Sequence, residues 1–326
     1  MKIGTIGYAT SRGLGHLCRD FYRHGIVTDV MVVRHPGVPT NEGWYPGAPE
    51  TGMRPFDHEK MREFCRGKDA MLFFETPFDW SLFDWCKQIG VKTFLIPMHE
   101  CFPSSAPKPY KFLNPSLLDV DYFGGPFLPL PVEYPWRQRT HAEHYVHNGG
   151  YLGMRGREGT TLLIEAMQYV RSPLRLTIRV QENVPKGHQA MMARDPRIEY
   201  IAATVPYEDL YGIGDVVVAP QKFNGCSLPL QEALASGMLV MSTDRYPMNT
   251  WLPREPLILT RGSQKAQIGG AYLTFDEAII DPQDIAVEMD VWYGREIGGF
   301  SRYGKAWAEE NSWERLKPRW LEALAS

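Results

Sequence analysis

The sequence is poor in cysteine and has no long apolar segment. Its five cysteines are scattered, without a Cys-x-x-Cys pair or a histidine at a zinc-binding spacing. We therefore expect reduced, mostly buried thiols rather than a disulfide scaffold or a zinc site. No run approaches the roughly 20 apolar residues that a membrane-spanning helix needs. The first expected strand begins at Lys2, which leaves no room for a signal peptide and favours a cytoplasmic protein.

A strong excess of charge of either sign is also missing. The chain has 35 Lys and Arg against 38 Asp and Glu, for a formal net charge of -3. This balance provides no general attraction to nucleic acid or to anionic lipid. What is present is a globular composition, 44% hydrophobic and 22% charged over 326 residues. A chain of this length can form the cores of two domains.

Short apolar segments alternate with expected helices along the whole chain. In the first half, the expected strands are Lys2–Tyr8, Val27–Val33, Ala70–Phe74 and Lys92–Ile96. In the second half, they are His144–Leu152, Arg175–Val180, Ile198–Ile201, Asp215–Ala219 and Leu239–Ser242. This alternation predicts an α/β architecture in which helices cover both faces of parallel sheets. Ligands of such sheets bind at the carboxyl ends of the strands.

Two segments rich in proline interrupt this alternation. Residues 126–135 have the composition of an interdomain connection. They divide the chain into two expected Rossmann-like domains, 1–135 and 136–311, with a cleft between them. The segment 36–55 is rich in Gly, Pro and Trp, and we expect it to be a long functional loop without regular structure.

The most informative segment, 222–237, is a polar turn that leads directly into a helix. Small residues such as Gly225 let the backbone approach a ligand closely. The first turn of the helix offers N–H groups and a positive dipole end to a diphosphate. Glu232 is a carboxylate that only accepts hydrogen bonds, which suits ribose hydroxyls. An ordinary strand-to-helix connection of an α/β protein is the alternative interpretation.

This segment resembles the signature of the retaining, GT4-like group of GT-B glycosyltransferases, in which seven residues separate two Glu residues. Asn224 stands at the position of the first Glu, and Glu232 at that of the second. Cys226 and Ser227 occupy the Phe-Gly positions of the pattern. The positions that keep the pattern are Gly225, Leu228, Pro229, Glu232, Ala233 and Gly237.

The resemblance implies a role for each part of this segment. Glu232 would hold the ribose, and the helix that begins near Leu228 would face the diphosphate. Asn224 and the backbone of residues 225–227 would contact hydroxyls of the sugar. Because an amide both donates and accepts hydrogen bonds, we expect Asn224 to alter the choice of donor rather than to abolish activity.

A second segment, 153–166, resembles the part of the family in which an Arg and a Lys neutralise the donor diphosphate. Here Arg155 and Arg157, beside Gly159, are the candidates for phosphate contacts, since a guanidinium binds phosphate oxygens in bidentate fashion. The chain departs from the family at Glu158, which stands at the Lys position. Either arginine is alternatively a solvated loop residue.

Two more segments match the family in the same order. Residues 199–211 resemble the segment whose backbone borders the nucleobase, which places Thr204 there. Residues 94–100 resemble the strand that ends beside the reacting sugar, here with His99 and Glu100. Glu100 would orient the imidazole or accept the proton of the acceptor hydroxyl.

The family resemblance also extends to both ends of the chain. The loop after the first strand borders the donor phosphate and the acceptor in the family, and here it contains Gly13, Gly15 and His16. A glycine pair alone is weak evidence for phosphate binding. The last helix, at about 312–326, is expected to return onto the first domain.

The resemblance implies transfer of a sugar from a UDP- or GDP-linked donor to an acceptor hydroxyl, with retention of configuration. We expect no cofactor and no metal. The spacing of Asp119 and Asp121 fits a metal site, but they lie in the approach to the linker. Arginines and the helix terminus would offset the diphosphate charge instead. A sugar-nucleotide epimerase and a non-catalytic sugar-nucleotide-binding protein remain alternatives, because one pocket serves all three.

The sequence leaves the acceptor open. Its compact size and the residues 147–150, His-Asn-Gly-Gly, resemble bacteriophage-encoded glycosyltransferases, some of which modify hydroxymethylated pyrimidines in DNA. Modified DNA is therefore one acceptor candidate, beside glycans, lipids and small molecules, and a phage protein would act in the host cytoplasm. The acidic balance disfavours DNA, whereas basic residues in the first domain leave it open.

Overall fold

The computed structural model describes residues 1–53, 55–151 and 156–326, and the chain divides into two compact units. Unit 1 comprises Met1–Pro131, Gly269–Leu273 and Trp313–Ser326. Unit 2 comprises Val132–Ile268 and Thr274–Ser312. The first change of unit thus falls between Pro131 and Val132, inside the proline-rich segment.

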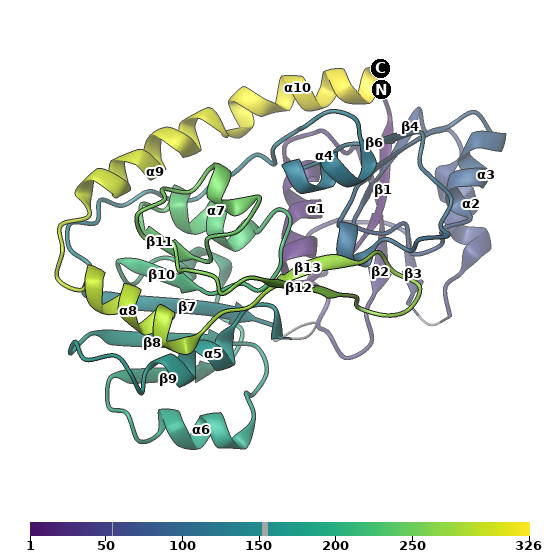
Figure 1. Cartoon of the computed structure of the whole chain (residues 1–326). Helices are drawn as coiled ribbons and strands as arrows, with labels where there is room; N and C mark the ends of the chain where they lie inside the picture. The colour runs from purple at the N-terminus through teal and green to yellow at the C-terminus, as the bar shows by residue number, and fades with distance from the viewer. Residues whose placement is uncertain (54, 152–155) are drawn as a thin grey trace. The chain divides into compact units, whose positions relative to one another are not determined.

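Unit 1 is built on a six-stranded sheet with the order β3-β2-β1-β4-β5-β6 (Figure 1). All five neighbouring pairs run parallel. The strands are β1 (Ile3–Gly7), β2 (Asp29–Arg34), β3 (Glu50–Gly52), β4 (Ala70–Phe74), β5 (Lys92–Ile96) and β6 (Lys111–Phe112). The helices are α1 (Gly13–Arg23), α2 (His58–Cys65), α3 (Leu82–Gln88), α4 (Leu117–Phe123) and α10 (Trp313–Ala325). The central strands β1 and β4 are buried throughout, as near-continuous apolar strands of a covered parallel sheet should be.

Unit 2 contains a five-stranded parallel sheet with the order β11-β10-β7-β8-β9 (Figure 1). Its strands are β7 (His144–Gly150), β8 (Arg175–Val180), β9 (Ile198–Ala202), β10 (Val216–Ala219) and β11 (Leu239–Ser242). Its helices are α5 (Thr160–Ala166), α6 (Lys186–Met192), α7 (Leu228–Ala235), α8 (Pro282–Trp292) and α9 (Gly298–Glu310). An antiparallel pair, β12 (Ser263–Ala266) and β13 (Phe275–Ala278), completes the regular strands that are described.

Strand β10 shows how the second sheet is covered. Successive side chains of a strand point to opposite faces. Val216 and Val218 belong to a buried cluster with Leu163 of α5 and other residues of α5 and α8. Val217 belongs to a different cluster, with Leu230 and other residues of α7. Helices therefore pack on both faces, and the predicted α/β class with parallel sheets is confirmed.

Helix α10 completes the core of unit 1. Trp320 is fully buried, with its ring in edge contact with that of Phe21 at a centroid distance of 4.9 Å. Its indole N–H donates to the carbonyl oxygen of Pro129 at 3.1 Å. A buried indole normally finds such a partner, so this one side chain fixes α10 to two separate segments of unit 1.

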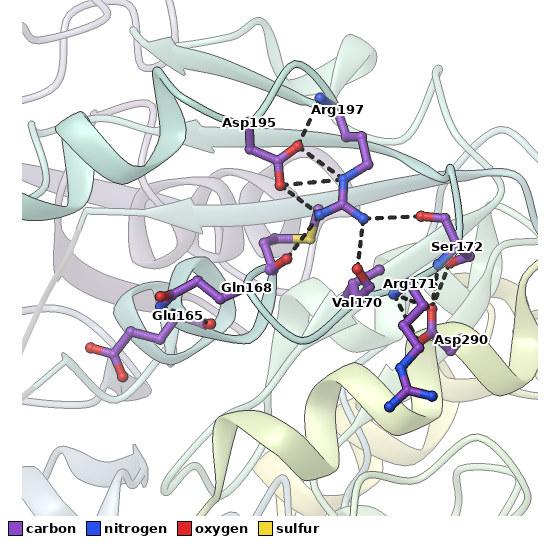
Figure 2. Close-up of polar contacts among 9 residues, drawn as sticks. Glu165, Gln168, Val170, Arg171, Ser172, Asp195, Arg197 and Asp290 are labelled. Atoms are coloured by element: carbon purple, nitrogen blue, oxygen red, sulfur yellow. Dashed lines mark hydrogen bonds and ion pairs between the residues drawn. The ribbon is translucent and has the colours of Figure 1, made fainter.

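Arg197, between α6 and β9, holds the carbonyl groups that follow α5 (Figure 2). Its guanidinium donates to the carbonyl oxygens of Met167 at 2.8 Å, Val170 at 2.9 Å and Ser172 at 3.0 Å. It also pairs with Asp195 at 2.6 Å, and this hydrogen bond lowers the pKa of the Asp195 carboxyl. These acceptors are the C-cap residue of α5 and two residues of the loop after it, so Arg197 fixes the path of the chain where it leaves the helix.

The structure corrects two expectations for unit 1. The segment 36–55 is not entirely irregular, because residues 50–52 form the edge strand β3 parallel to β2. Gly13, Gly15 and His16 lie in the first turns of α1 rather than in a loop. None of the helices within the described ranges is long and apolar enough to cross a membrane.

The early start of α1 has a steric reason. A Cβ on Gly15 would lie 2.1 Å from the carbonyl oxygen of Thr10, whereas a Cβ on Gly13 would meet nothing within 4 Å. The absence of a side chain at Gly15 lets the helix begin against the end of the preceding segment. Further along, the His16 ring lies 5.1 Å from that of Trp44.

Candidate functional site

The turn before α7 is held by hydrogen bonds of its own side chains. Ser227 has φ 49° and ψ 69°, a left-handed conformation that is rare for a residue with a side chain. Its N–H donates to Asn224 Oδ1 at 2.8 Å, and its hydroxyl donates to Gln221 Oε1 at 3.0 Å. Ser227 makes no side-chain capping bond to α7. The first turn of this eight-residue helix is therefore not capped by the Ser227 side chain, which bonds to the residues before the helix instead.

Two longer side chains fix the same turn from outside. Gln231 of α7 donates its amide to the carbonyl oxygen of Cys226 at 2.8 Å. Arg245 donates to the carbonyl oxygen of Asn224 at 2.9 Å. Asn224 is thus engaged through both its side chain and its backbone. The short Asn side chain reaches the N–H three residues later, as Asn commonly does in turns, so this residue shapes the turn that contains Gly225.

The loop before α5 presses against this turn. Gly159 has a positive φ of 73°, and a Cβ there would lie 2.1 Å from the carbonyl oxygen of Pro220. The Lys222 N–H donates to the carbonyl oxygen of Arg157 at 2.8 Å. The Arg157 guanidinium pairs with Glu158 at 2.9 Å. This contact places Arg157 beside the turn, while the other predicted phosphate ligand, Arg155, lies outside the described residues.

A buried histidine lies beneath the start of α5. His147 is 1% exposed, with Nδ1 2.7 Å from the carbonyl oxygen of Val218 and Nε2 2.8 Å from the Thr160 hydroxyl. A carbonyl oxygen only accepts, so Nδ1 carries the proton and Nε2 accepts from Thr160. Burial lowers the pKa of His147 to about 4. The neutral ring therefore joins β7, β10 and the first residue of α5.

Glu232 accepts a hydrogen bond on each carboxylate oxygen. The Tyr207 hydroxyl donates to Oε1 at 2.8 Å, and the Tyr211 hydroxyl donates to Oε2 at 3.2 Å. Tyr211 is buried, and burial together with the Glu232 charge raises the pKa of its phenol well above the ordinary value. Both tyrosines lie in the segment predicted to border the nucleobase, but the sequence analysis did not assign them to Glu232.

A third tyrosine supports these two. The ring of Tyr134 lies 5.7 Å from that of Tyr207 and 5.0 Å from that of Tyr211, both in edge-to-face geometry. Its hydroxyl accepts from the Tyr211 N–H at 3.1 Å and donates to the Glu208 carbonyl oxygen at 2.8 Å. Tyr134 therefore contacts the backbone that carries the two phenols. Thr204, on the same segment, is exposed, and its hydroxyl accepts from Gln181 at 3.4 Å.

His99 and Glu100 belong to unit 1, in a turn of 3-10 helix after β5 (His99–Cys101). They are 1% and 0% exposed. His99 Nδ1 lies 3.1 Å from Glu100 Oε2 and 3.7 Å from Asp119 Oδ1. The ring of Tyr122 stacks on the imidazole at a centroid distance of 4.8 Å. Two acidic side chains and one aromatic ring thus surround the predicted catalytic histidine.

Asp119 is a neighbour of His99 that the sequence analysis considered only as a metal ligand. It is 1% exposed and also accepts from the Ser116 hydroxyl at 2.5 Å. Among the residues that the structure describes, no three His, Cys, Asp or Glu side chains are grouped so as to hold a metal ion. The sequence contained no sign that Asp119 would lie beside His99, because only the packing of α4 brings it there.

Comparison with known proteins identifies the fold. No protein-family model matches the sequence, and no curated protein matches it significantly. HepE of Anabaena, solved in complex with UDP-glucose, is 10% identical with a TM-score of 0.73, covering 100% of this chain and 99% of that one. A glycosyltransferase of Rickettsia africae is 11% identical with a TM-score of 0.67, covering 99% and 97%. Sucrose-phosphate synthase of Thermosynechococcus elongatus is 14% identical with a TM-score of 0.62, covering 98% and 97%.

These similarities extend over essentially the whole of each chain. The GT-B fold expected from the sequence is therefore confirmed. At 10–14% identity, the similarity is one of fold. What unit 2 binds must be argued from its own side chains.

Proposed function

We propose that this chain is a glycosyltransferase that moves a sugar from a nucleoside diphosphate donor to an acceptor hydroxyl. The observation that carries the proposal is the position of Glu232 in α7, one turn after a tight turn whose shape is fixed by the side chains of Asn224 and Gln231. A helix start suits a diphosphate, and a carboxylate one turn later suits the ribose attached to it. HepE, which shares the fold, was solved with UDP-glucose.

The diphosphate would bind between the start of α7 and the loop before α5. The close approach of Gly159 to Pro220 brings these two backbone segments together. Arg157, whose carbonyl group is bonded to Lys222 in the turn, would provide positive charge, with Arg155 as a second candidate. We assign the sugar to Asn224 and the backbone at 225–227, and the base to the segment around Thr204.

The reaction that we propose is a front-face transfer with retention and without a metal. The bond between the anomeric carbon and the β-phosphate oxygen breaks, and its electron pair stays on the phosphate oxygen. The acceptor oxygen forms a bond to the anomeric carbon on the same face, and its proton passes to that phosphate oxygen. Arg157 and the start of α7 would stabilise the charge that develops on the diphosphate.

His99 and Glu100 would act on the sugar and the acceptor. The proposal gives His99 the contact with the transferred sugar, while Glu100 at 3.1 Å fixes the orientation of its imidazole. Donors linked to UDP or GDP are our candidates, and the UDP-glucose complex of HepE favours testing UDP first. A hydroxymethylated pyrimidine in DNA is one acceptor candidate, and its binding should weaken steeply with salt.

Donor binding tests the proposal directly. A nucleoside diphosphate or its sugar that binds the folded protein must raise its thermal unfolding midpoint. We expect stabilisation by UDP- or GDP-linked donors, and a loss of about 100-fold in donor affinity in Glu232→Ala, since two hydrogen bonds to a charged group disappear. Glu143→Gln, at an exposed position before β7, is the control and should bind as the wild type does.

A Glu232→Ala variant with wild-type donor affinity and turnover would rule out the site. Product analysis then separates the activities that this fold supports. A transferase converts the donor only with an acceptor present, an epimerase changes the donor without one, and a binding protein leaves it intact. The expected product is a glycosylated acceptor with retained configuration, together with one equivalent of free nucleoside diphosphate.

A further inference from the structure

Strands β12 and β13 form a hairpin whose base and tip belong to different units (Figure 1). Both strands lie in unit 2, whereas residues 269–273, at the tip between them, belong to unit 1. The chain therefore enters unit 1 for one short segment and then returns to unit 2. The base and the tip each contact a part of the candidate site.

The base of the hairpin packs against the turn at 222–227, which the proposed function makes the donor turn. The rings of Phe275 and Phe223 lie 4.3 Å apart, and these residues are 1% and 0% exposed. The Ala278 N–H donates to the carbonyl oxygen of Lys222 at 2.7 Å. Because Phe223 directly precedes Asn224, the conformation of the donor turn and the position of β13 depend on each other.

The tip of the hairpin pairs with the chain that follows His99. The Leu273 N–H donates to the carbonyl oxygen of Phe102 at 3.1 Å, and the Ser104 N–H donates to that of Ala271 at 2.8 Å. The pairing is antiparallel, and it is the main-chain mode by which one extended segment binds another. The Ser104 hydroxyl adds a bond to the same Ala271 oxygen at 3.2 Å.

Phe102 joins the tip to the turn that carries His99. Its N–H donates to the His99 carbonyl oxygen at 3.2 Å, while its own carbonyl oxygen accepts from Leu273. Its ring lies 5.0 Å from that of Phe123 in α4, the helix that also carries Asp119. The Leu273 side chain packs against the buried cluster that contains Phe102. The tip thus bonds to the residue that ends the His99 turn and packs against the core beside it.

We propose that Ala271 and Leu273 are positioning residues for His99, and that the hairpin makes their hold on the His99 turn depend on the donor turn. This inference rests on the proposed function for the role of His99 and for the ligand of the donor turn. A pairing of two main-chain bonds can open locally without unfolding of unit 1. A nucleotide that orders the donor turn fixes Phe223, which fixes β13 and keeps the tip closed on Phe102.

Hydrogen exchange of the ligand-free protein tests the hold of the hairpin on residues 101–104. Phe275→Leu keeps an apolar side chain but removes the ring contact with Phe223. Exchange at 101–104 should then become about tenfold faster, although these residues belong to unit 1 and Phe275 to unit 2. Phe300→Leu removes a ring contact with Trp292 at 5.1 Å elsewhere in unit 2, so it is the matched control and should leave exchange at 101–104 unchanged.

A second experiment follows the His99 ring itself by NMR, in protein labelled at the imidazole Cε1 and with the signal assigned from the His99→Gln spectrum. Addition of UDP or GDP should shift the His99 signal of the wild type. A variant with Gly-Gly inserted after Gln267 and again after Leu273 keeps the contacts of base and tip but lengthens the connection between them. It should bind the nucleotide within about twofold of the wild type, while the shift of the His99 signal falls to less than about a third.

The outcomes separate this inference from the function on which it rests. If neither UDP nor GDP binds the wild type, the donor site is wrong, and exchange at 101–104 in Phe275→Leu alone decides whether the hairpin holds the His99 turn. Exchange in Phe275→Leu that equals the wild-type rate overturns the positioning role. If a nucleotide binds but the His99 signal does not shift, or shifts equally in the insertion variant, the donor site stands and the coupling is overturned. Faster exchange in Phe275→Leu but not in Phe300→Leu, with the shift lost in the insertion variant, supports the proposal.

Discussion

Gly159 lies so close to Pro220 that a Cβ at residue 159 would fall 2.1 Å from the Pro220 carbonyl oxygen. No side chain fits into this distance without moving the backbone. Gly159 also has φ +73°, which side chains disfavour. The two loops that form the candidate diphosphate site can therefore approach each other this closely only because residue 159 has no Cβ.

Gly159→Ala should separate these loops. We expect a loss of about 2–4 kcal/mol in the free energy of unfolding, from the clash and the positive φ together, and at least a tenfold loss of donor affinity. Gly156→Ala is the control, because Gly156 also has a positive φ of 60° but a Cβ there meets nothing within 4 Å. It should cost about 1 kcal/mol and keep donor binding. Equal effects of the two variants in urea unfolding and titration would contradict the steric argument.

His147 should make the protein sensitive to acid. Its folded pKa is about 4, against 6.5 when unfolded, so the unfolded state binds more protons between these values. Stability is then full above about pH 6.5 and is lost as the pH falls toward 4, by about 2 kcal/mol between pH 7 and 5. His147→Gln should lose about 2 kcal/mol less over this interval in urea unfolding. The exposed His141→Gln should follow the wild type, and an unchanged pH dependence in His147→Gln would refute the assignment.

Arg197→Met should destabilise unit 2 without touching the candidate site. The substitution leaves three carbonyl oxygens and the Asp195 carboxylate without their common donor. We expect a loss of about 3 kcal/mol in the free energy of unfolding. Arg194→Met, at an exposed position nearby, should change it by less than about 0.5 kcal/mol. Similar unfolding curves for both variants would show that the network contributes little.

His99→Gln should separate chemistry from donor binding if the proposed reaction is right. Turnover should fall about 100-fold, as is typical for loss of a group that acts on the reacting centre, while donor affinity stays within about twofold. Glutamine keeps a hydrogen-bond donor near Glu100 and Asp119, so it avoids leaving the two acidic groups to face each other alone. Wild-type turnover in a folded His99→Gln protein would remove His99 from the mechanism.

Much of the architecture followed from local patterns in the sequence. The buried strand before residue 220 and the turn at 222–237 are continuous in the chain, so their apolar and polar residues indicated a strand, a turn and a helix directly. The alternation of such units predicted the α/β class. Strand β3 was missed because it has three residues and exists through its pairing with β2, which composition does not reveal.

The candidate site was only partly predictable, because several of its contacts also join residues that are distant in the sequence. Glu232 was identified from its position in a continuous motif. Tyr207 and Tyr211 lie 25 and 21 residues away from it, and only the folding of unit 2 brings their hydroxyls to its carboxylate. His147 was noted as part of a motif, but its neutral state depends on burial among groups distant in sequence. Local patterns thus indicate which residues are candidates for binding and catalysis, and the fold determines which other residues contact them.

The division of unit 1 into three segments has a consequence for biosynthesis. Phe21 is made before any residue of unit 2, but its ring contacts that of Trp320, which is made only after the last residue of unit 2. The core of unit 1 is therefore incomplete until α10 has been made, whereas unit 2 has all of its residues once Ser312 has been added. A nascent chain that stalls before α10 would present an open apolar surface and depend on chaperones.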